Sequence, residues 1–223
     1  MKKWLILLTL LLISCTAATQ LDIPYQKQQG PSCVQSQMLM AIKYYYPEST
    51  LTQADLDQRT GRNPDQWTWF SQAMPVLIEE NLDAYYYSLT PYEDLNPETV
   101  NQIYGDDGPF INSVTNWPAL KSSIEFLNQN PERYQKAKLS WQEVEEAFKN
   151  KYIILMIIDY NVLTMGLSTY AGHGVTITNI NQTHVTFHNS DLGPNQVAEK
   201  QRFIDAWNAP GTDNDVIIIK GKL

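Results

Sequence analysis

Cysteine, histidine and basic residues are all scarce in this chain of 223 residues. It holds two cysteines, three histidines, and 16 lysines and arginines against 24 aspartates and glutamates. So few thiols exclude a disulfide-rich scaffold, and their spacing relative to the histidines matches no zinc site. The net charge of −8 and the absence of any basic cluster argue against nucleic acid as a partner. No phosphate-binding loop and no Gly-x-Ser-x-Gly motif is present, so we expect no cofactor and no metal.

Long apolar runs are also lacking, except for a short one at the N-terminus. Met1-Lys2-Lys3 is followed by an apolar run from Trp4 to Ile13, which is too short to span a membrane. It ends in Leu12-Ile13-Ser14-Cys15, which is similar to the bacterial lipoprotein cleavage box. We therefore expect residues 1–14 to be a signal peptide and Cys15 to carry the lipid.

The expected location follows from this N-terminus. Acyl chains on Cys15 would anchor the protein to a membrane of the bacterial cell envelope, with residues 15–20 as a tether. The alternative is ordinary secretion, with cleavage near Ala17 or Ala18.

Lipidation of Cys15 would leave Cys33 as the only free thiol. Unpaired thiols are unusual in oxidising compartments, and this one follows Gly30-Pro31-Ser32 and precedes a helical pattern. The partial positive charge of a helix N-terminus lowers a thiol pKa, which favours a nucleophile. The alternative interpretation is a small buried apolar residue.

The first half of the chain has helical periodicity. Apolar residues recur at helical spacing from Cys33 until Pro47. Further helices are predicted over residues 52–60, 67–81 and 140–150, the last with Ser140 and Glu143 as a capping box. Residues 104–120 are rich in Gly, Asp, Pro and Asn, which predicts a long loop or an insertion.

The second half has the pattern of strands. They are predicted over residues 152–158, 174–180, 184–189 and 215–220. Helices followed by an antiparallel sheet indicate the α+β class.

The histidines differ in their surroundings. His173 lies between two glycines at the start of a predicted strand, where a substrate and a neighbouring helix have room to approach. His184 and His188 are expected to be structural or solvated residues on exposed positions. We therefore select His173 as the base of a thiol-based site.

Several segments together resemble the papain-like cysteine peptidases, most closely the bacteriocin-processing (double-glycine leader) type. They are Ile23-Pro24-Tyr25-Gln26-Lys27-Gln28, Cys33 heading a helix, Gly172-His173-Gly174-Val175-Thr176-Ile177, His188-Asn189-Ser190-Asp191-Leu192-Gly193-Pro194, and Phe203-Ile204-Asp205-Ala206-Trp207. The resemblance implies one papain-like α+β domain over residues 21–223. Residues 92–140, which are unfamiliar, would form an insertion or extra helices near the cleft.

The resemblance also implies roles for individual residues. Cys33 would be the nucleophile that forms a thioester, and His173 the base. Gln28 would donate its side-chain amide to the oxyanion, with Gln26 as the alternative.

The residue that orients His173 has two candidates. Asn189 falls where its strand ends, at the position of the asparagine in papain-like enzymes. Asp191 is the alternative, because the bacteriocin-processing type usually has aspartate.

The expected activity is hydrolysis of peptide or amide bonds in a peptide or protein substrate. Val34-Gln35 follow Cys33 where the family usually has Gly-Pro, and a side chain at position 34 could crowd the nucleophile. Two alternatives therefore stay open: an inactive papain-like binding or accessory lipoprotein, and a thiol acyltransferase of the same fold.

Overall fold

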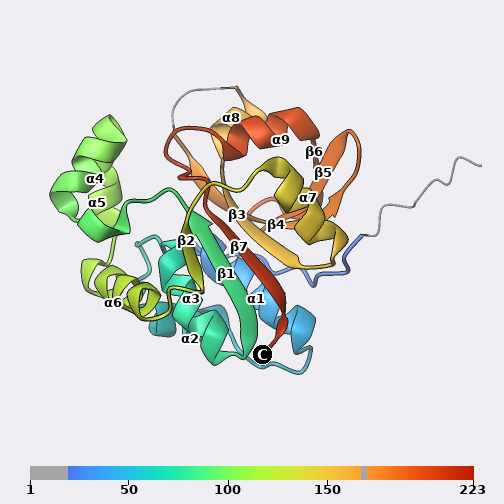
Figure 1. The fold of residues 1–223 in the computed structure, drawn as a ribbon, viewed down its shortest axis with the longest axis horizontal. Helices are drawn as coiled ribbons and strands as arrows, with labels where there is room; N and C mark the ends of the chain where they lie inside the picture. Colours follow the sequence, from blue (N-terminus) through green and yellow to red (C-terminus); the bar gives the residue numbers. More distant parts are fainter. Residues whose placement is uncertain (1–19, 167–169) are drawn as a thin grey trace, which may run out of the picture.

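The central element is a seven-stranded sheet with helices on both faces. The computed structural model describes residues 20–166 and 170–223. The strands run in the order β2-β1-β7-β3-β4-β5-β6. In Figure 1, α1, α2 and α3 lie on one side of the sheet, and α7, α8 and α9 lie on the other. This mixed architecture confirms the α+β class predicted from the sequence.

All neighbouring strands are antiparallel except β1 and β2, which are parallel. The strands are β1 (Leu82–Ser88), β2 (Tyr134–Lys136), β3 (Ile153–Asp159), β4 (Gly172–Ile180), β5 (His184–Asn189), β6 (Gly193–Glu199) and β7 (Val216–Lys222). The four predicted strands correspond to β3, β4, β5 and β7. The apolar run in β3 is buried on both faces, as expected for a strand covered by helices on each side.

The helix α1 (Cys33–Tyr45) packs against β4 and β7. Every residue from Val34 to Ile42 is buried, so α1 is a central helix of the core and not a surface helix. Its N-terminus at Cys33 is the one that the sequence predicts.

The remaining helices follow local start and stop signals. They are α2 (Gln53–Thr60), α3 (Phe70–Glu79), α4 (Pro97–Tyr104), α5 (Gly108–Val114), α6 (Trp117–Gln129), α7 (Trp141–Lys149), α8 (Tyr160–Thr164) and α9 (Lys200–Trp207). Short 3₁₀ turns, η1 (Tyr92–Asp94) and η2 (Gly105–Asp107), flank α4. Ser140 caps α7 in a capping box with Glu143, as predicted.

Of the two alternatives predicted for residues 104–120, a long loop or an insertion, the long loop is wrong. This segment forms η2, α5 and the start of α6, which Figure 1 shows at one end of the molecule. The residues that suggested a loop are helix starters here: Asn116 caps α6, and Pro lies in the first turn of both α5 and α6. Residues 92–140 thus contain the helices α4, α5 and α6.

Residues 1–19 and 167–169 are outside the described part of the chain. The expected signal peptide and Cys15 fall there. Within residues 20–166 and 170–223, no helix has the length and apolar character needed to cross a bilayer.

Candidate active site

The thiol of Cys33 lies where α1 meets β4. A Cβ atom added to Gly174 would lie 3.4 Å from the Cys33 sulfur, so the thiol packs closely against the strand that carries His173. Cys33 is unpaired. The Ser32 hydroxyl accepts the backbone N–H of Gln29 and donates to the Gln29 carbonyl. These two hydrogen bonds fix the chain just before α1.

The imidazole of His173 is oriented by Asn189. The distance from Nε2 of His173 to Oδ1 of Asn189 is 2.9 Å. With an amide oxygen as its partner, Nε2 carries the proton and donates, which leaves Nδ1 free to accept. His173 and Asn189 lie on adjacent strands, β4 and β5, because the β4–β5 register aligns Val175 with Asn189.

Asn189 is itself fixed by the turn that follows β5. Its Oδ1 accepts the backbone N–H groups of Asp191 at 3.0 Å and Leu192 at 3.1 Å. The Asn189 side chain is buried, whereas Asp191 is exposed and acts on the His173 ring through its charge. Of the two candidates for the orienting role, Asn189 is therefore the one in hydrogen-bonding position.

Gln28 is held at the same cleft by Ser190. The Ser190 hydroxyl donates to Oε1 of Gln28 at 2.7 Å, and the Gln28 backbone N–H donates to the Ser190 carbonyl at 2.9 Å. The amide nitrogen of Gln28 donates to the Gly30 carbonyl at 3.0 Å. Nε2 of Gln26 instead donates to the Lys27 carbonyl.

One cavity of about 210 Å³ brings these candidates together. Gln28, Cys33 and His173 all line it, and Gln26 is not among its lining residues. Val34 also lines it and is buried, so the side chain next to the nucleophile is part of the cavity wall. The segments that meet here are far apart in the sequence.

Burial disfavours the charged form of both the Cys33 thiol and the His173 imidazole. Burial raises the pKa of the Cys33 thiol. Smaller opposing effects lower this pKa: the backbone N–H groups of Gly174, Val34 and Cys33, and the positive charge of Arg62. Burial lowers the pKa of His173, and the hydrogen bond to Asn189 and the charge of Asp191 raise it by less. The expected depression of the thiol pKa is therefore wrong, because desolvation outweighs the helix N-terminus.

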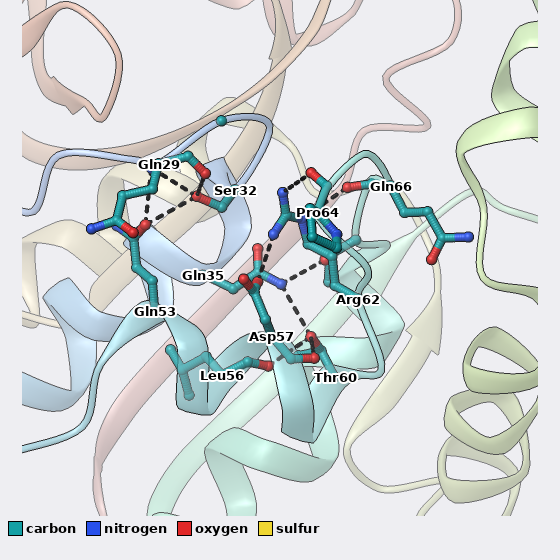
Figure 2. A network of polar contacts seen from close by, with 12 residues as sticks. Gln29, Ser32, Gln35, Gln53, Leu56, Asp57, Thr60, Arg62, Pro64 and Gln66 are labelled. Atoms are coloured by element: carbon teal, nitrogen blue, oxygen red, sulfur yellow. Dashed lines mark hydrogen bonds and ion pairs between the residues drawn. The ribbon is translucent and has the colours of Figure 1, made fainter.

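A polar network supports the start of α1 (Figure 2). The side-chain amide of Gln53 accepts from Ser32 and donates to the Lys27 carbonyl and to Ser36. It thereby fixes the segment between Gln28 and Cys33 on α2.

Arg62 anchors the opposite side of the network. It is buried, forms an ion pair with Asp57 at 2.8 Å, and donates to the carbonyls of Pro64 and Gln66. Figure 2 shows the guanidinium enclosed by these groups. The loop so fixed leads directly into Trp67 and Thr68, which line the cavity.

An acidic and aromatic wall of the same cavity was not predicted from the sequence. Asp213, Asp215 and Tyr104 line it, and Tyr104 donates to Asp213. Asp215 is buried and accepts the Tyr86 hydroxyl at 2.8 Å. Burial raises the pKa of Asp215 to about 8. Asp213-Asn214-Asp215 lies at the start of the strand predicted over residues 215–220, and this acidic cluster at a strand end was the available signal.

The other two histidines lie outside the cavity lining. His184 is exposed, as expected. His188 is buried, contrary to expectation: one ring nitrogen contacts the Ile23 carbonyl at 2.8 Å, and the other accepts the Asn195 N–H at 3.1 Å. The N-terminal segment covers β5 there, so His188 has a structural role. No cluster of potential metal ligands occurs in residues 20–166 and 170–223.

Comparison with known proteins identifies the fold. No family model matches the sequence, and no curated protein matches it. The structure is similar to a crystal structure described as a C39-like peptidase from Bacillus anthracis, with a TM-score of 0.52 and 11% sequence identity. The match covers 91% of this chain and 96% of that one. The chain therefore has the fold of a C39-like, papain-like peptidase.

Proposed function

We propose that this protein is a cysteine peptidase that cleaves peptide or amide bonds through a Cys33–His173–Asn189 triad. The observation that carries the proposal is one cavity lined by Cys33, His173 and Gln28, with the free side of His173 set by its 2.9 Å contact with Asn189. Thiol catalysis requires a nucleophile, a base and a residue that orients the base. The similar fold of a C39-like peptidase supports the same conclusion.

Acylation starts with proton transfer from Cys33 to His173, and burial favours the neutral form of each group. As the sulfur of Cys33 attacks the carbonyl carbon, Nδ1 of His173 takes the thiol proton. The Cys33 backbone N–H and the Gln28 side-chain amide would donate to the oxyanion. The C–N bond then breaks, His173 returns its proton to the leaving amine, and a thioester to Cys33 remains.

Deacylation repeats these steps with water. His173 takes a proton from water, whose oxygen attacks the thioester carbon, and the C–S bond breaks. The acid product leaves, and Cys33 regains its proton from the imidazolium. An amine in place of water would give acyl transfer by the same residues, which is the acyltransferase alternative.

The test is digestion of a peptide library, with products read by mass spectrometry. We expect the wild type to cleave and Cys33→Ala to be inactive, with His173→Ala reduced by about 10² to 10⁴-fold. His184→Ala is the matched control, because His184 is exposed and should leave the rate unchanged. Adding a primary amine in the same assay separates hydrolysis from acyl transfer, since transfer yields the substituted amide.

A second candidate is an accessory binding module without activity. Two features favour it: Val34 occupies the cavity wall beside the nucleophile, and burial raises the pKa of the Cys33 thiol. Full retention of ligand binding by Cys33→Ala, together with no cleavage of any library member by the wild type, would establish this function instead.

We also propose lipid anchoring at Cys15 in the bacterial cell envelope. The proposal rests on Leu12-Ile13-Ser14-Cys15 after the apolar run. Intact-mass analysis of the membrane fraction should give an N-terminal, acylated Cys15. A soluble, unmodified species starting near Thr19 would show secretion instead.

A further inference from the structure

Gln37 connects the nucleophile helix to the strands beneath it. It lies one turn after Cys33 in α1 and is completely buried. Its amide nitrogen donates to the carbonyls of Met156 in β3, at 3.2 Å, and Val175 in β4, at 2.6 Å. The helix bearing the thiol is thus tied to the strand bearing His173.

The amide oxygen of Gln37 is directed at the thiol side of this contact. A Cβ atom added to Gly174 would overlap Oε1 of Gln37 and lie 3.4 Å from the sulfur of Cys33. The oxygen and the sulfur therefore flank the same glycine. Turning the amide over would point its oxygen at the two strand carbonyls, so the donated hydrogen bonds determine the orientation.

This oxygen has no hydrogen-bond partner among the described residues. Leaving a buried acceptor unpaired costs about 1–3 kcal/mol, so an uncompensated oxygen at this position calls for an explanation. The Cys33 sulfur makes no hydrogen bond to this oxygen, so the effect of the oxygen on the thiol acts through space. The negative end of an amide dipole also disfavours a thiolate beside it.

We infer that Gln37 is a positioning residue that keeps the Cys33 thiol protonated in the resting protein, through the dipole of a buried amide whose oxygen lies beside the same glycine as the sulfur. The inference deepens the proposed peptidase function and rests on it: the thiol becomes a nucleophile only as His173 removes its proton. Other groups act on the thiol as well. Arg62 opposes Gln37 by its positive charge. The remaining titratable groups that face the thiol across the cavity are His173, Tyr104, Tyr170, Asp213 and Asp215.

The test is the pH profile of Cys33 alkylation by iodoacetamide. Gln37→Met keeps the side-chain length and removes the amide dipole. We expect the midpoint of alkylation to move to lower pH by about half a unit or more, which is at least a threefold gain in thiolate fraction below the midpoint.

Gln35→Met is the matched control. Gln35 is equally buried on α1 and also has an unpaired Oε1, but its amide nitrogen donates to Thr60 and Thr68, on the side of α2. Both variants should lower the melting temperature, and only Gln37→Met should move the alkylation midpoint. A purely structural role of Gln37 would lower stability without the shift.

An unchanged or raised midpoint in folded Gln37→Met overturns the inference. If Gln37→Met does not fold, Gln37→Glu, which has nearly the same shape, is the second variant and should move the alkylation midpoint to higher pH. An unchanged midpoint in Gln37→Glu also overturns the inference. The result is separate from the proposed function, because alkylation needs no turnover. Failure of the wild type to cleave peptides would refute the hydrolase while leaving the thiol profile as measured.

Discussion

The glycine after His173 is required by close packing and not by backbone conformation. A side chain at Gly174 would overlap Gln37 and would lie 2.8 Å from its Cδ atom. We expect Gly174→Ala to destabilise the protein by roughly 1–3 kcal/mol, the usual cost of overpacking, and to reduce cleavage by displacing α1 from β4. Chemical denaturation and the library assay measure the two effects.

Gly221→Ala is the control for this substitution. Nothing lies within 4 Å of a Cβ atom there, so the same chemical change should be nearly neutral. Equal stabilities of the two variants would show that the helix–strand contact at Gly174 is looser than the structure indicates.

The orienting residue of His173 can be decided by comparing two variants. Asn189→Ala removes the acceptor of the ring N–H and should lower kcat/KM by roughly 10 to 1000-fold. Asp191→Ala removes only a nearby charge and should cost less than about tenfold. Because the charge of Asp191 raises the pKa of His173, its loss should also move the acidic limb of the pH–rate profile to lower pH. The reverse ranking of the two variants would assign the role to Asp191.

Single residues were predictable where their chemistry was rare. One free thiol and one histidine between glycines were enough to select Cys33 and His173, which line one cavity. The burial of His188 was not predictable, because its partner carbonyl belongs to Ile23, far away in the sequence. The raised thiol pKa was missed for the same reason: a local sequence shows a helix N-terminus but not the desolvation around it.

At the scale of elements, local signals gave reliable helix ends, and polar edge strands escaped detection. Thr52 and Ser140 begin α2 and α7 with capping boxes, and Gly61 ends α2 in the left-handed conformation at φ 71°. The edge strand β6 carries mostly exposed residues, so it lacks the apolar alternation that reveals a strand. Asparagine and proline in residues 104–120 are typical both of turns and of helix N-termini. In this fold they lie at the N-termini of α5 and α6.

The loop between α2 and α3 depends on a single buried cation. Arg62→Met should destabilise the protein by roughly 3–5 kcal/mol, because Asp57 and two carbonyls lose their donor. It should also move Cys33 alkylation to higher pH, since the positive charge of Arg62 lowers the thiol pKa. Denaturation and the alkylation profile report these effects separately.

Arg59→Met, in the last turn of α2, is the control. Arg59 pairs with Glu79 and Glu80 near the surface, where such pairs contribute about 1 kcal/mol or less. An alkylation shift in Arg59→Met as large as that in Arg62→Met would mean that long-range charge, and not the buried guanidinium, acts on the thiol.

For the whole molecule, the sheet assembles the site from segments separated by much of the chain. Gln28 meets Ser190, and Cys33 meets Gly174, through contacts that no local pattern encodes. The α+β class followed from the order of helices and strands, whereas the seven-stranded topology depended on strands β1, β2 and β6, which were not predicted. The resemblance in short motifs indicated which of these distant segments meet at the site. Periodicity alone could not indicate this.

The buried aspartates should make stability fall as pH rises. Burial raises the pKa of Asp215 to about 8 from 3.8, and it also raises the pKa of Asp213. A carboxyl whose pKa is higher in the folded protein binds a proton there that the unfolded chain releases. Its contribution is complete below about pH 4 and is lost as pH rises towards 8, with a slope of up to about 1.4 kcal/mol per pH unit for one proton.

Denaturation at several pH values between 4 and 8 measures this slope. Asp215→Asn keeps the shape and removes the charge, so its unfolding free energy should depend less on pH and should exceed that of the wild type at pH 8. Asp106→Asn, at an exposed position in η2, should reproduce the wild-type curve. A wild-type stability that rises through this range, with no change in slope for Asp215→Asn, would mean that Asp215 is ionised and compensated in the folded protein. That outcome would contradict the buried environment of this wall of the cleft, where Tyr86 donates to Asp215 and Tyr104 donates to Asp213.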